Sequence, residues 1–166
     1  MKVRNNLTIY LSLLATLILD SIYLSSSFQV IKPTFVLLAL IYWNIALPDK
    51  VGIGLSLVIG IIVDFIEGSV LGTYPLLFVL VAYLCQRFFY QFRVMKIVQQ
   101  SIILFVLFFF IKQYLTIDFS FSYGSNLNLF NSGNLLITFL YSLLSAIAWP
   151  VLFYCLRYSR RRWIQN

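Results

Sequence analysis

The sequence predicts an all-helical, polytopic membrane protein with about six transmembrane helices. Of its 166 residues, 61% are hydrophobic and 10% are charged, a balance that excludes a large water-soluble domain. Long apolar runs recur along the chain and are separated by short polar clusters. Because no internal repeat or long linker divides the sequence, we expect a single transmembrane helical domain over residues 1–166.

The first predicted span covers residues 7–27 and follows the basic residues Lys2 and Arg4. A basic start followed by an apolar run is also the pattern of a cleaved signal peptide. Asp20 interrupts this run, however, and no A-x-A-like cleavage site follows it. We therefore favour an uncleaved first transmembrane helix.

The second and third predicted spans, residues 33–47 and 51–68, are short for helices that need about 20 residues to cross a bilayer. Pro33 can occupy the first turn of the second span. Pro48 opens a Pro-Asp-Lys triplet that predicts a tight polar turn into the third span. This pair is therefore expected to form a squat hairpin or to be partly re-entrant.

The other predicted spans cover residues 71–90, 97–115 and 135–157. Between the last two lies the only sizeable predicted external loop, residues 116–134, whose Ser, Asn and interleaved aromatic residues suit the lipid surface or a partner. Aromatic residues near the span ends are typical of interfacial anchors, although the Trp149-Pro150 pair can instead mark a kink. These aromatic residues are Trp43, Tyr90, Trp149 and Trp163.

Basic residues predict the orientation, because the cytoplasmic segments of membrane proteins are enriched in Lys and Arg. With a cytoplasmic amino terminus, only Lys32 and Lys112 of the 12 basic residues lie toward the outside. The sequence therefore predicts two cytoplasmic termini and an even number of spans. The ten inner residues are Lys2, Arg4, Lys50, Arg87, Arg93, Lys96, Arg157, Arg160, Arg161 and Arg162. The last four are expected to attract anionic membrane lipids or, less favoured, an acidic cytosolic surface.

Several classes of site are disfavoured by composition. The chain has no histidine, which removes the commonest catalytic base and metal ligand. Cys85 and Cys155 lie in apolar runs without metal-ligand spacing, so we expect buried packing residues rather than a disulfide. Topology accounts for the net charge of +7, so a nucleic-acid partner is not expected. We expect neither enzyme activity nor a cofactor.

The most informative segment is a glycine ladder that contains one acid. Gly60, Asp64, Gly68 and Gly72 follow one another at intervals of four residues. Residues at this spacing share a helical stripe, and small residues on such a stripe let a second helix approach closely where lipid removes the usual hydrophobic drive. The ladder therefore predicts a helix-packing face with an acid that turns toward protein rather than toward lipid.

Three charged residues of different spans have similar predicted depth. Asp20, Asp64 and Lys112 all lie about 20 Å from the cytoplasmic ends of their spans, at about 1.5 Å per residue. One interpretation is hydration near the outer interface, and the other is a buried polar cluster in which Asp64 pairs with Lys112 or with donors of a partner helix. Glu67 is expected to be a solvated carboxylate.

The same segment resembles a known family. Pro48-Asp-Lys-Val-Gly-Ile-Gly54, the ladder from Gly60 to Gly72 and the apolar stretch 77–83 are similar to the MreD family of bacterial rod shape-determining membrane proteins. Chain length, short spans, a basic tail and Tyr42-Trp43 before the proline turn agree with the family. Pro75 departs from it, because a small residue often stands there, and it is expected to alter the start of the fourth helix.

This resemblance implies a non-enzymatic, multi-pass component of the cell-elongation machinery in the bacterial cytoplasmic membrane. The implied partners are MreC, the actin-like MreB, RodA and a penicillin-binding transpeptidase. The family is also similar in fold to the substrate-binding subunits of energy-coupling-factor transporters. Membership of the cell-elongation machinery implies a role in cell shape and lateral peptidoglycan synthesis.

Two mechanisms for the ladder remain open at this point. In the first, Gly60, Gly68 and Gly72 form a close-packing face, and Asp64 fixes the register with MreC or a second copy of the chain. In the second, the same glycines pack the third span against its own neighbours. A different function, a small-solute or vitamin-binding transporter subunit, would place Asp20, Asp64 and Lys112 around a cavity that opens outward.

Overall fold

A computed structural model describes residues 2–22, 30–48, 50–68, 70–123 and 132–163. Within these ranges the chain forms helices and no strands. The helices are α1 (Lys2–Ser21), α3 (Phe35–Ala46), α4 (Ile53–Glu67), α5 (Thr73–Arg87), α6 (Phe89–Val94), α7 (Ile97–Tyr123) and α8 (Ser132–Trp163). The prediction of an all-helical protein is therefore confirmed.

Each of the six predicted spans contains a helix, and α6 is an additional short helix after α5. The predicted loop over residues 116–134 is wrong at both ends, because α7 continues to Tyr123 and α8 begins at Ser132. The segment from Thr116 to Tyr123 has no Pro or Gly to stop the helix, and Gly124 is the first such residue. The remainder of this loop and the predicted end of the first span lie outside the described residues.

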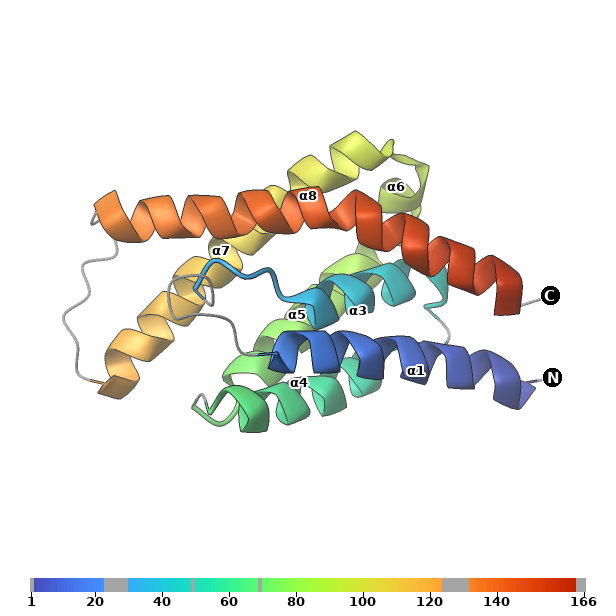
Figure 1. The fold of residues 1–166 in the computed structure, drawn as a ribbon, viewed down its shortest axis with the longest axis horizontal. Helices are drawn as coiled ribbons and strands as arrows, with labels where there is room; N and C mark the ends of the chain where they lie inside the picture. The colour runs from blue at the N-terminus through green and yellow to red at the C-terminus, as the bar shows by residue number, and fades with distance from the viewer. Residues whose placement is uncertain (1, 23–29, 49, 69, 124–131, 164–166) are drawn as a thin grey trace.

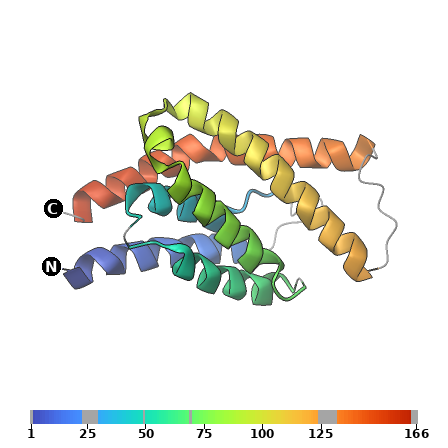
Figure 2. The same ribbon diagram turned by 180° about the vertical axis from the view of Figure 1, so that it is seen from behind.

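Consecutive long helices run in alternating directions, and both termini lie at the same end of the molecule (Figure 1). We call this the terminal end and the other the distal end. The α4 and α5 helices form one packed pair, and α7 and α8 form another. Seen from behind, α5 crosses in front of α3, and α7 crosses in front of α8 (Figure 2). The α3 helix packs against α1, α5 and α8 and so occupies the centre of the bundle.

Burial of α3 on every side makes it the core of the fold. All residues from Val36 to Ile45 are buried. Such a helix has no polar stripe, since Asn44 is the only strongly polar residue in this run. Its amide donates to the Leu40 carbonyl at 2.9 Å and accepts from Gln86 at 3.3 Å, so this buried polar group is satisfied.

The short length of α3 agrees with its central position. Its 12 residues extend about 18 Å, which is shorter than the roughly 30 Å of a hydrocarbon core. Helix ends at membrane depth are tolerated where they are buried in protein. By length and composition, two helical segments of the described chain are able to cross a membrane, Ile97–Asp118 and Ser132–Arg162.

The hairpin in this fold is formed by α4 and α5, not by the second and third predicted spans. Gly60 makes it possible, because a Cβ at this position would lie 2.5 Å from Cα and 2.8 Å from N of Pro75. Pro75 is the third residue of α5, within a first turn whose amides have no intrahelical partner, so the helix accommodates it. The close approach of α4 and α5 therefore depends on glycine.

Several predictions from apolar runs were wrong, because a run does not show which of its residues face the core. Trp43 and Trp149 have no exposed surface and are core residues rather than interfacial anchors, whereas Tyr90 is 82% exposed. The α8 helix continues through Pro150. Cys85 and Cys155 are both free thiols, but Cys155 is exposed rather than buried.

Replacing Gly60 by Ala is expected to destabilise the protein by about 1–3 kcal/mol, because the new methyl group would overlap the backbone at Pro75. Gly54→Ala is the matched control on the same helix, since a Cβ there meets nothing within 4 Å. It should be neutral or stabilising by up to about 1 kcal/mol through helix propensity. Thermal unfolding of the two purified variants in detergent measures the difference, and equal midpoints would contradict the close contact.

Candidate functional site

The distal end of the molecule gathers the acidic residues. Here α1, α4 and α7 end, and α3, α5 and α8 begin (Figure 1). Four of the five acids of the sequence lie on these helix ends: Asp20, Asp64, Glu67 and Asp118. The fifth, Asp49, is outside the described residues. Because these helix starts leave backbone N–H groups without intrahelical partners, the carboxylates meet unsatisfied donors.

Asp20 joins α1 to α3. It lies in the last turn of α1, and its two carboxylate oxygens accept the backbone N–H groups of Phe35 at 3.0 Å and Val36 at 2.8 Å. These are the first two residues of α3. Asp20 therefore caps the core helix from a neighbouring helix, and negative charge is favourable at this position because of the helix dipole.

Lys32 completes the same junction from the opposite direction. Its ammonium group donates to the carbonyl oxygens of Leu19 at 2.8 Å, Asp20 at 2.7 Å and Ile22 at 2.9 Å. These carbonyls end α1, where a cation is favoured. From the sequence, Lys32 was expected only to be one of two basic residues on the outer side. A basic residue shortly after a span that ends in an acid was the signal that could have indicated this cap.

Asp64 has the corresponding role between α4 and α5. Its side chain is 4% exposed, and its carboxylate accepts the N–H of Gly72 at 2.6 Å and of Tyr74 at 3.0 Å. The prediction that this acid turns toward protein is confirmed. Its partners at the start of α5 belong to the next helix of the same chain.

The three glycines of the ladder have different roles. Only Gly60 makes the close helix contact, whereas a Cβ at Gly68 or Gly72 would meet nothing within 4 Å. Gly68 ends α4 with φ of 65°, and Gly72 precedes α5 with φ of 110°. Both angles favour glycine because an L side chain is strained there. Gly68 and Gly72 therefore lie in the turn between α4 and α5 and do not continue the helical stripe of Gly60.

Asp118 is a site residue that the sequence analysis missed. Its carboxylate accepts the hydroxyl of Thr73 at 3.0 Å and so links the end of α7 to the first residue of α5. Its position near the end of an apolar run, like that of Asp20 and Asp64, was the available signal.

Pro48 lies far from these acids, in a turn in which the Leu47 carbonyl accepts the N–H groups of Lys50 and Val51.

A small polar cavity of about 110 Å³ lies among these junctions, and we call it the distal pocket. Asp20 and Lys112 both line it, as their similar predicted depth suggested, whereas Asp64 is not among its lining residues. The Lys112 ammonium lies 5.0 Å from the ring centroid of Tyr141, whose hydroxyl shares a 2.8 Å hydrogen bond with Thr34. The lining also includes Lys32 and Glu67, and Glu67 is exposed, as expected.

The chemistry of the distal end is that of a structural junction. Asp20, Asp64 and Lys32 direct their charges at the ends of helices. Among the described residues, no group of three His, Cys, Asp or Glu side chains could hold a metal ion. Small-molecule pockets typically measure about 300–1,000 Å³. The distal pocket is well below this size.

Comparisons with known proteins identify relatives of the chain. The family model described as rod shape-determining protein MreD matches residues 1–159. A rod shape-determining protein MreD from Haemophilus influenzae is 32% identical over 142 residues, which cover 81% of this chain and 79% of that protein. No solved structure matches the chain.

Replacing Asp64 by Asn is expected to destabilise the protein by about 1–3 kcal/mol, because one carboxylate oxygen becomes an NH₂ group that faces a backbone N–H. Glu67→Gln is the isosteric control on an exposed acid of the same helix and should change stability by no more than about 0.5 kcal/mol. Unfolding midpoints in detergent compare the two. A larger loss for Glu67→Gln would argue against the cap.

The Asp20–Lys32 junction is expected to behave as one unit in a double-mutant cycle. Asp20→Asn and Lys32→Met should show a coupling free energy of about 0.5–3 kcal/mol, since Lys32 binds the carbonyl of the residue whose carboxylate caps α3. A cycle of Asp20→Asn with Lys50→Met, at the terminal end, is the control and should be additive within about 0.5 kcal/mol. Additivity in both cycles would show that the two caps are independent.

Proposed function

Since this chain belongs to the MreD family of rod shape-determining proteins, we propose that it is a scaffold of the cell-elongation complex that binds MreC and helps control lateral peptidoglycan synthesis. Family membership makes it a shape-determining membrane protein and not an enzyme. The observation that carries the proposal is the extent of the match, because residues 1–159 include nearly the whole of the described helical bundle.

The proposed topology has six spans, α1, α3, α4, α5, α7 and α8, in the bacterial cytoplasmic membrane, with both termini in the cytoplasm. It is supported by the alternating helix directions and by the distribution of charge (Figure 1). Lys32 and Lys112 lie at the distal end, and the ten other basic residues belong to segments at the terminal end. An excess of Lys and Arg of this kind favours the cytoplasmic side.

In this topology α3 is too short to cross the membrane by itself, and it is accommodated because the neighbouring helices shield it from lipid. The α4 and α5 helices, with 15 residues each, are also short, so the bilayer is expected to thin beside them. We also propose that this six-span topology is similar to the fold of the substrate-binding subunits of energy-coupling-factor transporters. The number of helices supports this similarity.

We place the MreC helix on the outer face of α4, which we call the α4 stripe and define as Gly54, Val58, Ile61 and Phe65. These residues recur at helical spacing and are exposed, from 36% at Ile61 to 73% at Phe65. Around Gly54 a Cβ would meet nothing within 4 Å, so a second helix has room to approach the backbone. The single membrane span proposed for MreC suits one such stripe.

This location differs from the docking surface expected from the ladder. Gly60 is occupied by Pro75, and the Asp64 carboxylate is occupied by Gly72 and Tyr74. These contacts support the intramolecular role of Gly60 and Asp64, and we therefore propose the opposite face of α4 for the partner helix. MreB, RodA and a penicillin-binding transpeptidase are proposed neighbours within the complex. A second copy of the chain is the alternative occupant of the stripe.

The small-solute or vitamin carrier is the less favoured alternative. The distal pocket does bring Asp20 and Lys112 together at the end predicted to face outward, which is the feature that a carrier needs. Its volume of about 110 Å³ is too small for a vitamin, however, because such pockets usually exceed about 300 Å³. A small molecule retained through gentle purification would favour the carrier.

Replacing Gly54 by Leu is expected to reduce co-purification of MreC by about tenfold, equivalent to about 1.4 kcal/mol, because the side chain fills the space of the partner helix. Gly133→Leu is the matched control, since this glycine is also exposed and open but lies on α8. Both variants should insert and fold. Undiminished MreC binding by Gly54→Leu would remove the stripe as the contact. If Val58→Cys forms a disulfide between two copies of the chain in the absence of MreC, the α4 stripe is the contact of a homodimer.

A further inference from the structure

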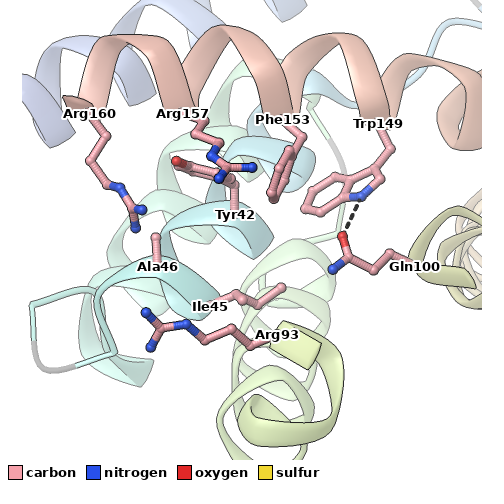
Figure 3. A pocket seen from close by; sticks show the side chains of 9 residues that line it. All are labelled: Tyr42, Ile45, Ala46, Arg93, Gln100, Trp149, Phe153, Arg157 and Arg160. Carbon is pink, nitrogen blue, oxygen red and sulfur yellow. Dashed lines mark hydrogen bonds between the residues drawn. The ribbon is translucent and has the colours of Figure 1, made fainter. Parts of the chain in front are cut away.

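A second cavity, of about 230 Å³, lies at the terminal end and is not used by the proposed scaffold contact. Its walls come from four helices, α3, α6, α7 and α8. We call it the arginine pocket and define it by Tyr42, Arg93, Trp149, Phe153, Arg157 and Arg160. Figure 3 shows the Arg157 guanidinium beside Tyr42, Arg160 reaching from α8 toward Ala46, and Arg93 of α6 on the opposite side of the cavity.

Arg157 and Arg160 bring two guanidinium groups to the same wall of the cavity and make it cationic. Arg157 and Arg160 are half-buried, Arg93 is exposed, and none of the described lining residues carries a carboxylate. Like charges in one pocket repel each other, and the repulsion is relieved when an anion lies between them. Guanidinium groups are planar forks of N–H donors that match the oxygens of a phosphate group.

Tyr42 gives an independent indication of a ligand. Its side chain is 3% exposed, and its hydroxyl is one of the buried polar groups without a hydrogen-bond partner. An unpaired buried hydroxyl is destabilising, so its presence in the wall of a cavity indicates a partner that enters the cavity. The neighbouring guanidinium groups only donate hydrogen bonds, and a phosphate oxygen could accept from both.

The wall behind these donors is rigid. Trp149 donates from its indole N–H to the Gln100 side-chain oxygen at 3.2 Å, and the Gln100 amide donates to the Phe92 carbonyl at 2.8 Å. The Phe153 ring packs edge-on against Tyr42 at 5.5 Å between centroids, and Arg157 lies 5.9 Å from the same ring. These contacts hold Arg157 and the hydroxyl in place before a ligand arrives, which lowers the entropic cost of binding.

We propose that the arginine pocket binds a phosphate group, and that Tyr42, Arg157 and Arg160 are its principal donors. The terminal end also presents exposed aromatic residues, Tyr90 at 82% and Tyr158 at 66%, as expected at the headgroup level of a bilayer. The phosphate is therefore assigned to an anionic lipid headgroup, with a soluble phosphate compound as the other source of the same chemistry. This inference does not depend on MreC binding.

Native mass spectrometry of the full-length protein, released from nanodiscs of phosphatidylcholine with phosphatidylglycerol, tests the lipid source. Arg160→Gln should reduce retention of phosphatidylglycerol by about tenfold, since a charge-assisted hydrogen bond is lost. Arg161→Gln is the matched control, because it removes the same charge from an exposed neighbour outside the pocket, and it should change retention by less than about twofold. Calorimetric titration with inorganic pyrophosphate tests the soluble source with the same variants.

Tyr42→Phe separates a binding role from a structural one. The variant removes only an unpaired hydroxyl, so the ligand-free protein should unfold at the same temperature or higher, while phosphate affinity falls by about fivefold. Selective loss with Arg160→Gln and Tyr42→Phe supports the site, and the probe that binds identifies the source. Absence of binding by both probes, or equal losses with Arg160→Gln and Arg161→Gln, would overturn it.

Discussion

The fold depends on the satisfaction of helix ends away from water. In a bilayer an unpaired N–H group has no solvent to bond with, so each start of a helix needs an acceptor from the protein. Asp20 supplies it for α3 and Asp64 supplies it for α5, in each case from the final turns of the preceding long helix. Lys32, which precedes α3, donates hydrogen bonds to the last carbonyls of α1. These charges therefore connect helices rather than perform chemistry.

The caps explain how a helix as short as α3 can be the core. With its start held by Asp20 and its sides covered by α1, α5 and α8, α3 needs neither the length nor the polar ends of an independent span. Two polar side chains of this core helix are paired inside the bundle, because Trp43 donates to Ser12 at 2.8 Å and Asn44 donates to the Leu40 carbonyl at 2.9 Å. The outer faces of the surrounding helices remain free for lipid and partners, which is the arrangement that a membrane scaffold requires.

The two ends of the bundle have different electrostatic characters and different proposed tasks. At the distal end the Asp20 carboxylate accepts from backbone amides, Lys32 donates to backbone carbonyls, and Lys112 lies over the Tyr141 ring, so these charges are used within the fold. The terminal end carries the excess of arginine, including Arg157 and Arg160 in a cavity whose wall holds the unpaired Tyr42 hydroxyl. These cations and this unpaired donor indicate a ligand more strongly than the distal pocket does. The scaffold contact and the anion site thus occupy separate surfaces.

The sequence by itself determined the helical class, the approximate positions of six helices and the importance of the segment from Gly60 to Gly72, because hydrophobic length and glycine spacing are local properties. It also predicted that Asp64 faces protein, since an acid is costly in lipid. Only the tertiary structure decided that α4 pairs with α5, that Gly68 and Gly72 serve turns, and that Asp118 meets Thr73. Lys32 and Tyr42 were likewise beyond the sequence. The partner of a charge or hydroxyl is set by how helices distant in the chain pack together, and no local pattern records that packing.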